Sequence, residues 1–335
     1  MGGPGGRAAR RRRRRAGPGR RRAGRRSRPV NAAPPVTVTE YTDPGCVWSW
    51  AAEPRLRWLR LRYGHLLAWR QVFGVQIADL RAERPDFDPR ADAPEYLRRW
   101  ASVAERTGTP LTTRLHWMHG STAPAGRAAI AARDQGDAVA ARVLRRLREA
   151  VFLHGEPADT PPRVRAALAG VPGLDPERLL AAMESAEVRT RLRADAAETR
   201  RVHPATAAAA ATGPGTPAPG HPVAEGSGHR YAFPTLVLTA GARTIVLPGF
   251  RGTEEYEAAL TELLPGSTGR ARPLPPADRL LRETGSLTGP EVALLAGGRP
   301  PTDAVRVRTG TGDVWLPRAA DAAPSATPSV ERSAS

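Results

Sequence analysis

Residues 36–54 read VTVTEYTDPGCVWSWAAEP, and the order of elements that begins here decides the fold. The β-branched run at 36–41 predicts a short strand, and the Asp-Pro-Gly sequence at 43–45 ends it. Apolar residues recur every three or four positions from 46 to 63, which predicts a helix. The run LLAWRQVFGV at 66–75 predicts a second strand. A strand, a helix and a strand in this order pack most naturally as a right-handed βαβ unit with parallel strands.

The middle of the chain, residues 81–203, has the patterns of helices. The clearest pattern lies at 137–153, where Val and Leu residues at helical spacing form an apolar stripe. Its arginines lie off that stripe: Arg142, Arg145, Arg146 and Arg148. Further helices are predicted at 95–107, 124–136 and 175–200. The last of these begins with Asp-Pro-Glu, which places a cap, a proline and an acidic residue in its first turn.

Residues 204–228 contain 22 Ala, Gly, Pro, Thr or Ser among 25 positions, which predicts a flexible loop. Two short strands follow at 235–238 and 244–247, and the turn around Gly241 predicts an antiparallel hairpin. A helix at 254–264 closes this half of the chain. The predicted order is therefore β-α-β, a helical block and β-β-α. We interpret it as an α/β, thioredoxin-like fold with a helical insertion between the βαβ and ββα halves.

Composition and turn signals mark the predicted boundaries of the parts. A capping-box pattern at 288–291 and a turn at 310–312 between two short strands indicate a small module near the C-terminal end. The predicted parts are a disordered Arg-rich arm at 1–34, a thioredoxin-like core at 35–80 and 229–265, the helical insertion at 81–203, the flexible loop at 204–228, a linker at 266–277, the small C-terminal module at 278–317 and a disordered tail at 318–335.

The net charge of +18 belongs mostly to the N-terminal arm. Residues 1–30 hold 13 arginines and no acidic residue, whereas the rest of the chain holds 38 arginines against 33 acidic residues. We therefore expect no nucleic-acid binding except through the arm, which is able to neutralise phosphates; a passive tail is the alternative. No apolar run is long enough to span a membrane, and no apolar stretch follows the arginines as in a secretory signal. We expect a cytoplasmic protein.

Cys46 is the only cysteine of the chain. A single thiol excludes an intramolecular disulfide and a zinc site built from several cysteines. Cys46 lies where the first strand ends and the first helix begins, and the backbone N–H groups at a helix start favour an anion. We expect this position to lower the pKa of the thiol. The alternative is a small buried cysteine that only packs.

The motif at 43–50, DPGCVWSW, resembles the active-site turn of DsbA-like thioredoxin-fold oxidoreductases. In the branch of dithiol-disulfide isomerases and hydroxychromene-carboxylate isomerases, this turn reads Asp-Pro-x-Cys-Pro-Trp-Cys-Trp. Pro54 resembles the helix-kinking proline of thioredoxin relatives, and YAFPTL at 231–236 resembles the loop whose proline is cis and faces the active cysteine. The likeness covers about residues 36–264. It implies that Cys46 is the nucleophile and that the substrate contacts Trp48, Phe233, Pro234 and Thr235.

Ser49 stands where the family has its second cysteine, and Val47 replaces the usual proline. A dithiol enzyme resolves its mixed disulfide with the second cysteine, which an alcohol cannot do. The expected function is therefore that of a monothiol thiol–disulfide oxidoreductase or isomerase, in which Cys46 attacks a disulfide of a protein or small molecule and an external thiol resolves the product. We expect a low-molecular-weight thiol as co-substrate and no bound cofactor. Ser49 lies one helical turn beyond Cys46, within hydrogen-bonding reach of the sulfur, and is the second predicted catalytic residue.

Two other functions remain open. One is a degenerate thioredoxin-fold adaptor that binds a peptide beside Pro234 without turnover, and the other is a small-thiol-dependent isomerase or transferase. His116 and His119 have the i, i+3 spacing of a helical metal pair, but no third ligand stands nearby and we expect no metal site. Glu40 and Asp43 flank the predicted site. A carboxylate at a strand end is usually solvated, and proton relay by Glu40 is the alternative.

Overall fold

The computed structural model describes residues 1–3, 34–210 and 220–318. It separates the chain into two units, residues 1–33 and residues 34–335. The predicted arm and the predicted C-terminal tail fall almost entirely outside the described residues, and so does the middle of the predicted loop at 204–228. All of the helices and strands described lie in the second unit.

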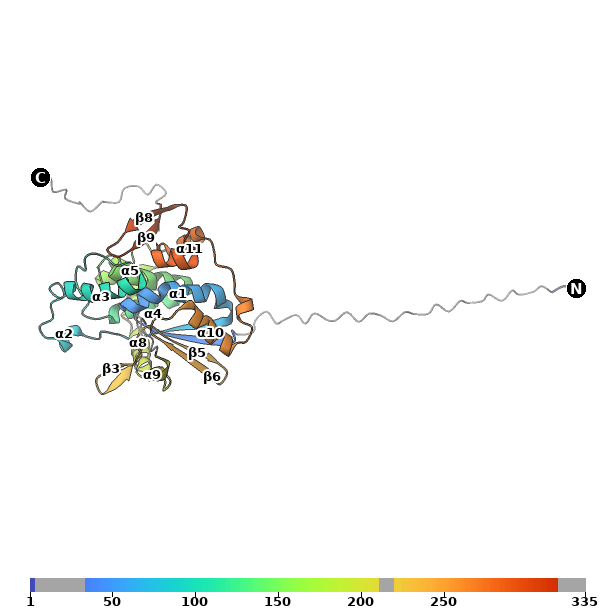
Figure 1. Cartoon of the computed structure of the whole chain (residues 1–335), viewed down its shortest axis with the longest axis horizontal. Helices are drawn as coiled ribbons and strands as arrows, with labels where there is room; N and C mark the ends of the chain where they lie inside the picture. Colours follow the sequence, from blue (N-terminus) through green and yellow to red (C-terminus); the bar gives the residue numbers. More distant parts are fainter. Residues whose placement is uncertain (4–33, 211–219, 319–335) are drawn as a thin grey trace. The chain divides into compact units, whose positions relative to one another are not determined.

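A mixed four-stranded sheet forms the centre of the second unit (Figure 1). Its order is β2 (Leu67–Phe73), β1 (Val36–Thr42), β5 (Thr235–Ala240) and β6 (Arg243–Pro248). β1 runs parallel to β2 and antiparallel to β5, and β5 pairs antiparallel with β6. The β-branched run that opens the fold is therefore an inner strand, and six of its seven residues are buried.

Helix α1 (Val47–Tyr63) joins β1 to β2, and α10 (Thr253–Leu263) follows β6. These elements form the predicted β-α-β and β-β-α halves. The chain between the halves forms α2 (Leu80–Glu83), α3 (Ala93–Thr107), α4 (Ala123–Ala132), α5 (Asp137–Phe152), α6 (Pro161–Ala167), α7 (Pro176–Met183) and α8 (Ala186–Thr199). The α/β, thioredoxin-like fold with a helical insertion is thus confirmed.

The insertion is less continuous than its sequence pattern indicates. The predicted single helix at 175–200 is wrong, because Ser185 begins a new helix there: its side chain accepts a hydrogen bond from the backbone N–H of Val188 and separates α7 from α8. His116 and His119, whose i, i+3 spacing would place them on one face of a helix, lie in residues 108–122, which form no helix.

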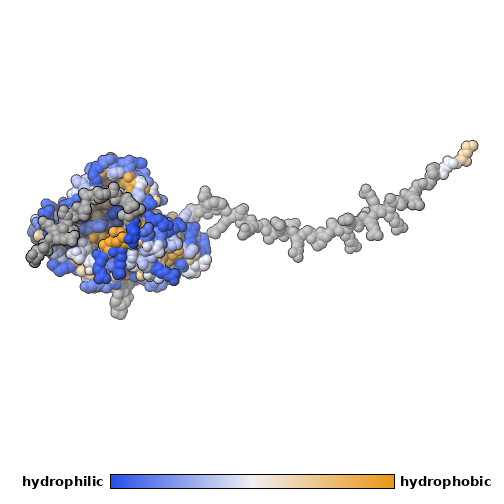
Figure 2. Space-filling model, turned by 90° about the horizontal axis from the view of Figure 1, so that it is seen from above, coloured by the Kyte–Doolittle hydropathy of each residue, from blue (hydrophilic) through white to orange (hydrophobic). Residues whose placement is uncertain are grey.

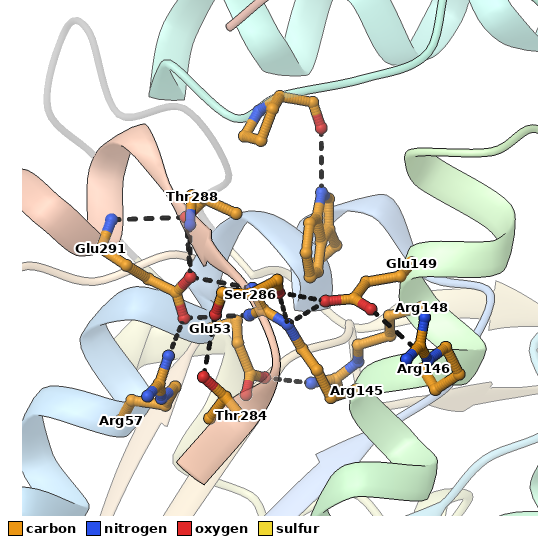
Figure 3. Close-up of polar contacts among 12 residues, drawn as sticks. Glu53, Arg57, Arg145, Arg146, Arg148, Glu149, Thr284, Ser286, Thr288 and Glu291 are labelled. Carbon is orange, nitrogen blue, oxygen red and sulfur yellow. Dashed lines mark hydrogen bonds and ion pairs between the residues drawn. The ribbon is translucent and has the colours of Figure 1, made fainter. Parts of the chain in front are cut away.

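Helix α5 buries two of the arginines that lie off its apolar stripe. Arg145 is 4% exposed and Arg148 is completely buried, whereas arginines in such positions usually face solvent. The reason is that carboxylates of other elements, and one of α5 itself, reach them (Figure 3). Arg145 binds Glu149 and Glu291, and Arg148 binds Glu53, so each buried cation has an anionic partner.

The prediction of a flexible loop at 204–228 is wrong at both of its ends. The chain there forms α9 (Thr206–Ala209), β3 (Val223–Glu225) and β4 (Gly228–Arg230), the last two as a hairpin. Arg251 donates to the last carbonyl of α9 at 2.7 Å, and Arg200 of α8 forms an ion pair with Glu225 of β3. Arginines of neighbouring elements therefore hold segments whose own composition favours disorder.

A second, smaller sheet lies near the C-terminal end of the described chain. The elements of this part are α11 (Ala277–Thr284), β7 (Leu287–Thr288), α12 (Gly289–Leu295), β8 (Ala304–Arg308) and β9 (Asp313–Pro317). The three strands are antiparallel in the order β7-β9-β8. Thr288 and Glu291 form a capping box at the start of α12, and this helix packs against α1.

The described surface carries few large hydrophobic side chains. On the face shown in Figure 2, hydrophilic residues predominate and hydrophobic residues form small patches. Among the described residues, the exposed large hydrophobic ones beyond Met1 are Val223, Val305, Val307 and Leu316. Within the same ranges no helix is long and apolar enough to cross a membrane.

Candidate active site around Cys46

The turn before α1 is organised by the buried carboxylate of Asp43. It accepts hydrogen bonds from the backbone N–H of Gly45 at 2.7 Å, from that of Gln76 at 2.7 Å and from the hydroxyl of Thr122 at 2.8 Å. The donors belong to the turn, to the segment after β2 and to the start of α4. Asp43 therefore fixes the end of β1 against the helical insertion. Cys46 is the N-cap residue of α1, although its side chain makes no capping hydrogen bond.

The sulfur of Cys46 lies against the loop that precedes β5. Cys46 is 4% exposed, and its thiol donates a hydrogen bond to the carbonyl oxygen of Phe233 at 3.5 Å. The peptide bond between Phe233 and Pro234 is cis, as the resemblance implies. Two sequence motifs whose contacting residues are 187 positions apart thus meet at the start of α1.

Aromatic and aliphatic side chains surround the sulfur. We call this set the thiol neighbourhood; it consists of Tyr41, Cys46, Val72, Tyr231 and Phe233. The rings of Tyr41 and Tyr231 stack with their centroids 4.2 Å apart. The ring of Phe233 packs on Gly74, where an added Cβ would lie 1.9 Å from the ring, so glycine alone leaves room for it. Trp48 packs beside this set and is partly buried.

The thiol neighbourhood determines how Cys46 ionises. Burial raises the pKa of the Cys46 thiol above its ordinary value, and the negative charge of Asp43 raises it further. The hydroxyl and the backbone N–H of Ser49, and the backbone N–H of Trp48, act in the opposite direction. The expectation of a lowered pKa at the helix start is therefore wrong, because the loss of solvent outweighs the donors at the start of α1.

Two of the predicted site residues turn their side chains into the protein. Ser49 and Thr235 are both completely buried. The oxygen of Ser49 accepts a hydrogen bond from the hydroxyl of Thr42 at 3.0 Å, and the Thr235 hydroxyl donates to the carbonyl of Ala232 at 2.7 Å. The structure thus brings Ser49 to the sulfur of Cys46, whereas the Thr235 hydroxyl is engaged within its own loop.

Comparison with known proteins agrees with this geometry. Residues 37–203 match the DSBA-like thioredoxin domain. The chain belongs to the DsbA-like thioredoxin family. This is a family of thiol–disulfide oxidoreductases.

Several solved structures resemble the DsbA-like chain, and no curated protein matches it. One is a candidate protein disulfide isomerase from Nitrosomonas europaea, with 20% identity over 68% of this chain and 95% of that chain and a TM-score of 0.48. Another is the cytosolic disulfide reductase DsbM from Pseudomonas aeruginosa, with 20% identity over 68% and 98% of the two chains and a TM-score of 0.46. A third is a candidate DsbA oxidoreductase from Streptomyces coelicolor, with 21% identity over 72% and 94% and a TM-score of 0.45.

The acidic residues that flank the DsbA-like site are buried. Glu40 is completely buried and accepts hydrogen bonds from the side chains of Trp69 at 2.9 Å and Gln71 at 3.0 Å, with Arg60 as an ion partner. Burial alone would raise the pKa of Glu40, but the neighbouring arginines hold it below its usual range. Burial raises the pKa of Asp43, in spite of its hydrogen bonds. The expectation that these carboxylates are solvated is therefore wrong.

The ring of His119 lies against the turn before Cys46. An added Cβ on Gly45 would lie 3.1 Å from this ring. His119 is 3% exposed, and its Nε2 has no hydrogen-bond partner among the described residues. Burial lowers the pKa of His119 to about 4, and Asp159 offsets only part of that effect. The ring is therefore neutral at neutral pH. In the described parts of the chain, no three His, Cys, Asp or Glu side chains are grouped as metal ligands.

Several residues of the DsbA-like site were not singled out from the sequence. Tyr41 lies two positions before the motif at 43–50, and Tyr231 is the first residue of the motif at 231–236. These positions were the signal available in the sequence. Thr42 hydrogen-bonds to Ser49, and Arg148 hydrogen-bonds to Thr42. Neither residue carries a comparable signal in the sequence. Their positions depend on contacts between strands and helices far apart in the sequence.

Proposed function

We propose that this protein is a monothiol thiol–disulfide oxidoreductase or isomerase in which Cys46 is the nucleophile. The observation that carries the proposal is the contact between Cys46 Sγ and the carbonyl oxygen of Phe233, 3.5 Å apart at the start of α1. This contact sets the single thiol of the chain between the first backbone N–H groups of a helix and an irregular loop. A disulfide that lies along the loop meets the sulfur there.

The reaction begins when Cys46 thiolate attacks one sulfur of a substrate disulfide R–S–S–R′. A bond forms between Cys46 Sγ and the R sulfur, the original S–S bond breaks, and R′–S⁻ leaves and takes up a proton. Ser49 has no thiol to attack this mixed disulfide. The thiolate of a small external thiol therefore attacks the R sulfur, forms a new disulfide with R and releases Cys46 as thiolate. One disulfide is consumed and one is formed, so the electrons balance.

The side chains around the sulfur suggest how a substrate is held. Trp48 is partly buried, and its ring meets that of Phe250 edge-on with centroids 6.2 Å apart. We assign side-chain contacts to Trp48 and Phe233, and backbone contacts to Pro234 and Thr235. A low-molecular-weight thiol is the co-substrate that the second step requires, with no bound cofactor. Such thiols are abundant in a reducing cytoplasm, where we place the reaction.

The test is a single-turnover reaction of the whole protein with 2-hydroxyethyl disulfide as the probe, followed by intact-mass measurement. We expect an adduct on Cys46 that persists until 2-mercaptoethanol is added and then disappears. Cys46→Ala abolishes the adduct, whereas Ser49→Ala still forms it. The proposal is overturned if the folded protein forms no adduct although its thiol reacts with the same probe after unfolding.

A second function, a peptide-binding adaptor, is favoured by one specific observation. Cys46 is 4% exposed and burial raises the pKa of its thiol, which are the properties of a cysteine that only packs. In that case the loop at 233–235 binds an extended peptide and the sulfur does not react. Absence of the adduct, together with peptide binding that survives Cys46→Ala, would favour the adaptor.

A further inference from the structure

The buried guanidinium of Arg148 connects α5 to the active-site helix and to β1. Arg148 is completely buried, its Nη1 donates to Glu53 of α1, and its Nη2 lies 3.8 Å from Glu40 Oε1. Figure 3 shows Arg148 beside Glu53 in the polar network between α1 and α5. The same Nη2 donates to the hydroxyl oxygen of Thr42, the last residue of β1, at 2.9 Å. The guanidinium is therefore held by two carboxylates and directed at one hydroxyl.

The direction of each hydrogen bond in this path follows from the chemistry of Arg148. A guanidinium has donors and no acceptor, so the Thr42 oxygen accepts from Arg148. The Thr42 hydrogen then points at the Ser49 oxygen, 3.0 Å away. With its oxygen accepting from Thr42, Ser49 has its own hydrogen left to donate, and the Ser49 hydroxyl acts on the Cys46 thiol so as to favour its ionised form.

We propose that Arg148 is a positioning residue for the active site, because through Thr42 it holds Ser49 as a hydrogen-bond donor to Cys46 Sγ. This inference deepens the monothiol function proposed above and takes its functional meaning from it. Ser49 is then more than the remnant of a second cysteine. It is the donor that faces the sulfur when the thiol becomes a thiolate and again when the external thiol releases it.

The hydrogen bonds of this path are shielded from solvent. Thr42, Ser49 and Arg148 are all completely buried, so water does not replace a lost hydrogen bond in the path. The carboxylate of Asp43 opposes a thiolate at Cys46. Arg148 does not act by its net charge, which Glu53 and Glu40 compensate. It acts by fixing the orientation of two hydroxyl groups.

The experiment measures the pKa of Cys46 from the ultraviolet absorbance of the thiolate, with Cys46→Ala as the blank. Thr42→Val keeps the shape of the side chain but breaks the path, and Ser49→Ala removes the donor. We expect each to raise the Cys46 pKa by about 1 pH unit, since a hydrogen bond to a charged group is lost. The Thr42→Val and Ser49→Ala double variant should show no further rise, because both changes remove the same donor. Thr42→Ser should retain the wild-type pKa.

Two further variants test Arg148 itself and the specificity of the path. Arg148→Lys keeps the charge but loses the planar fork that reaches Glu53 and Thr42 together, so it should raise the pKa as Thr42→Val does, with no addition when the two are combined. Thr39→Val is the matched control: Thr39 is also a buried β1 threonine that accepts from an arginine, Arg70, at 3.5 Å, but it does not contact Ser49. We expect Thr39→Val to leave the pKa unchanged.

Two results would overturn the inference. One is an unchanged pKa in Thr42→Val while Ser49→Ala raises it, which would show that Ser49 needs no support from Arg148. The other is an equal rise in Thr39→Val, which would show a general effect of β1. The readout is ionisation and needs no turnover, so a negative disulfide-exchange assay leaves this test intact. An unchanged pKa likewise leaves the exchange chemistry standing.

Discussion

Helix α1 contacts two buried regions whose titratable groups ionise in opposite ways. At its start lies the thiol neighbourhood, in which burial raises the pKa of Cys46, with neutral His119 close by. Along its middle lies a set that we call the ionic cluster, made of Arg57, Arg145, Glu149, Ser286 and Glu291. There the pKa of Glu291 is lowered to about 2.

The difference shows that burial alone does not decide whether a group is charged. Loss of solvent is the largest cause acting on both Cys46 and Glu291, and in both it favours the neutral form. At Glu291 the guanidinium groups of Arg145 and Arg57 outweigh it, whereas at Cys46 the carboxylate of Asp43 adds to it. The chain therefore uses buried charge to fix α1 and keeps the Cys46 thiol neutral.

The largest effect is expected from removing the charge of Glu291. Glu291→Gln keeps the shape of the side chain but leaves Arg57 and Arg145 buried without their shared carboxylate. We expect a loss of about 3–5 kcal/mol in the free energy of unfolding, measured by chemical denaturation. The matched control is Glu283→Gln, whose carboxylate is 46% exposed and pairs with Arg279; it should change stability by less than about 0.5 kcal/mol. Equal losses in the two variants would contradict the contrast.

The next largest effect is expected from the protonation of His119 at acidic pH. The folded pKa of about 4 lies below the ordinary value of 6.5, so between these values the unfolded chain binds the extra proton. Stability therefore falls as the pH drops from 6.5 to about 4, by up to about 3 kcal/mol. His119→Gln should flatten the stability profile in this window. A profile with the same slope in both proteins would mean that His119 is already protonated, or solvated, in the folded state.

A smaller effect is expected from opening the thiol neighbourhood. Phe233→Ala removes a ring of the thiol neighbourhood, so we expect water to reach Cys46 and the largest cause of its raised pKa to weaken. We expect alkylation of the thiol at neutral pH to become about tenfold faster, which corresponds to a pKa lowered by about one. Phe87→Ala is the control, since Phe87 is equally buried but belongs to another cluster. A similar acceleration in both variants would indicate general loosening of the fold.

The smallest effect is expected at the edge of the ionic cluster. Arg146 precedes Leu147 on α5, its side chain is 38% exposed, and its Nε lies 3.9 Å from Glu149 Oε2. Arg146→Gln should change the free energy of unfolding by no more than about 0.5 kcal/mol, because an exposed ion pair is weak. Chemical denaturation of this variant and of Glu291→Gln compares the loss of a partly exposed arginine with the loss of a buried carboxylate. A loss above about 2 kcal/mol would show that this partly exposed pair stabilises the fold as strongly as the buried ones.

The fold was predictable because its decisive signals are local. The β-branched run of β1, the helical period of α1 and the turn between β5 and β6 each occupy a few neighbouring positions. The site was predictable in part, since Cys46 and the Phe233–Pro234 peptide bond belong to short motifs that a family resemblance connects.

The electrostatics were not predictable, because they depend on contacts distant in the sequence. The raised pKa of Cys46 comes from walls supplied by two strands and a loop. The buried arginines of α5 look solvent-facing in the helical pattern, but their carboxylates come from Glu53, 95 positions before Arg148, and Glu291, 146 positions after Arg145. The amino-acid composition likewise gave no indication of the β3–β4 hairpin, which is stabilised by an ion pair with Arg200 at the end of α8.

The capping residue of α12 has a consequence for how the protein is made. Glu291 and its partner Arg57 are 234 positions apart, so the ribosome produces α1 and α5 long before their shared carboxylate exists. Until then Arg57 lacks its carboxylate partner, and Arg145 has only Glu149 of its own helix. A polypeptide released before α12 is complete would have every residue around Cys46 and still lack the anchor of its helix. The full set of ion pairs that fixes α1 therefore forms only after residue 291 has been synthesised.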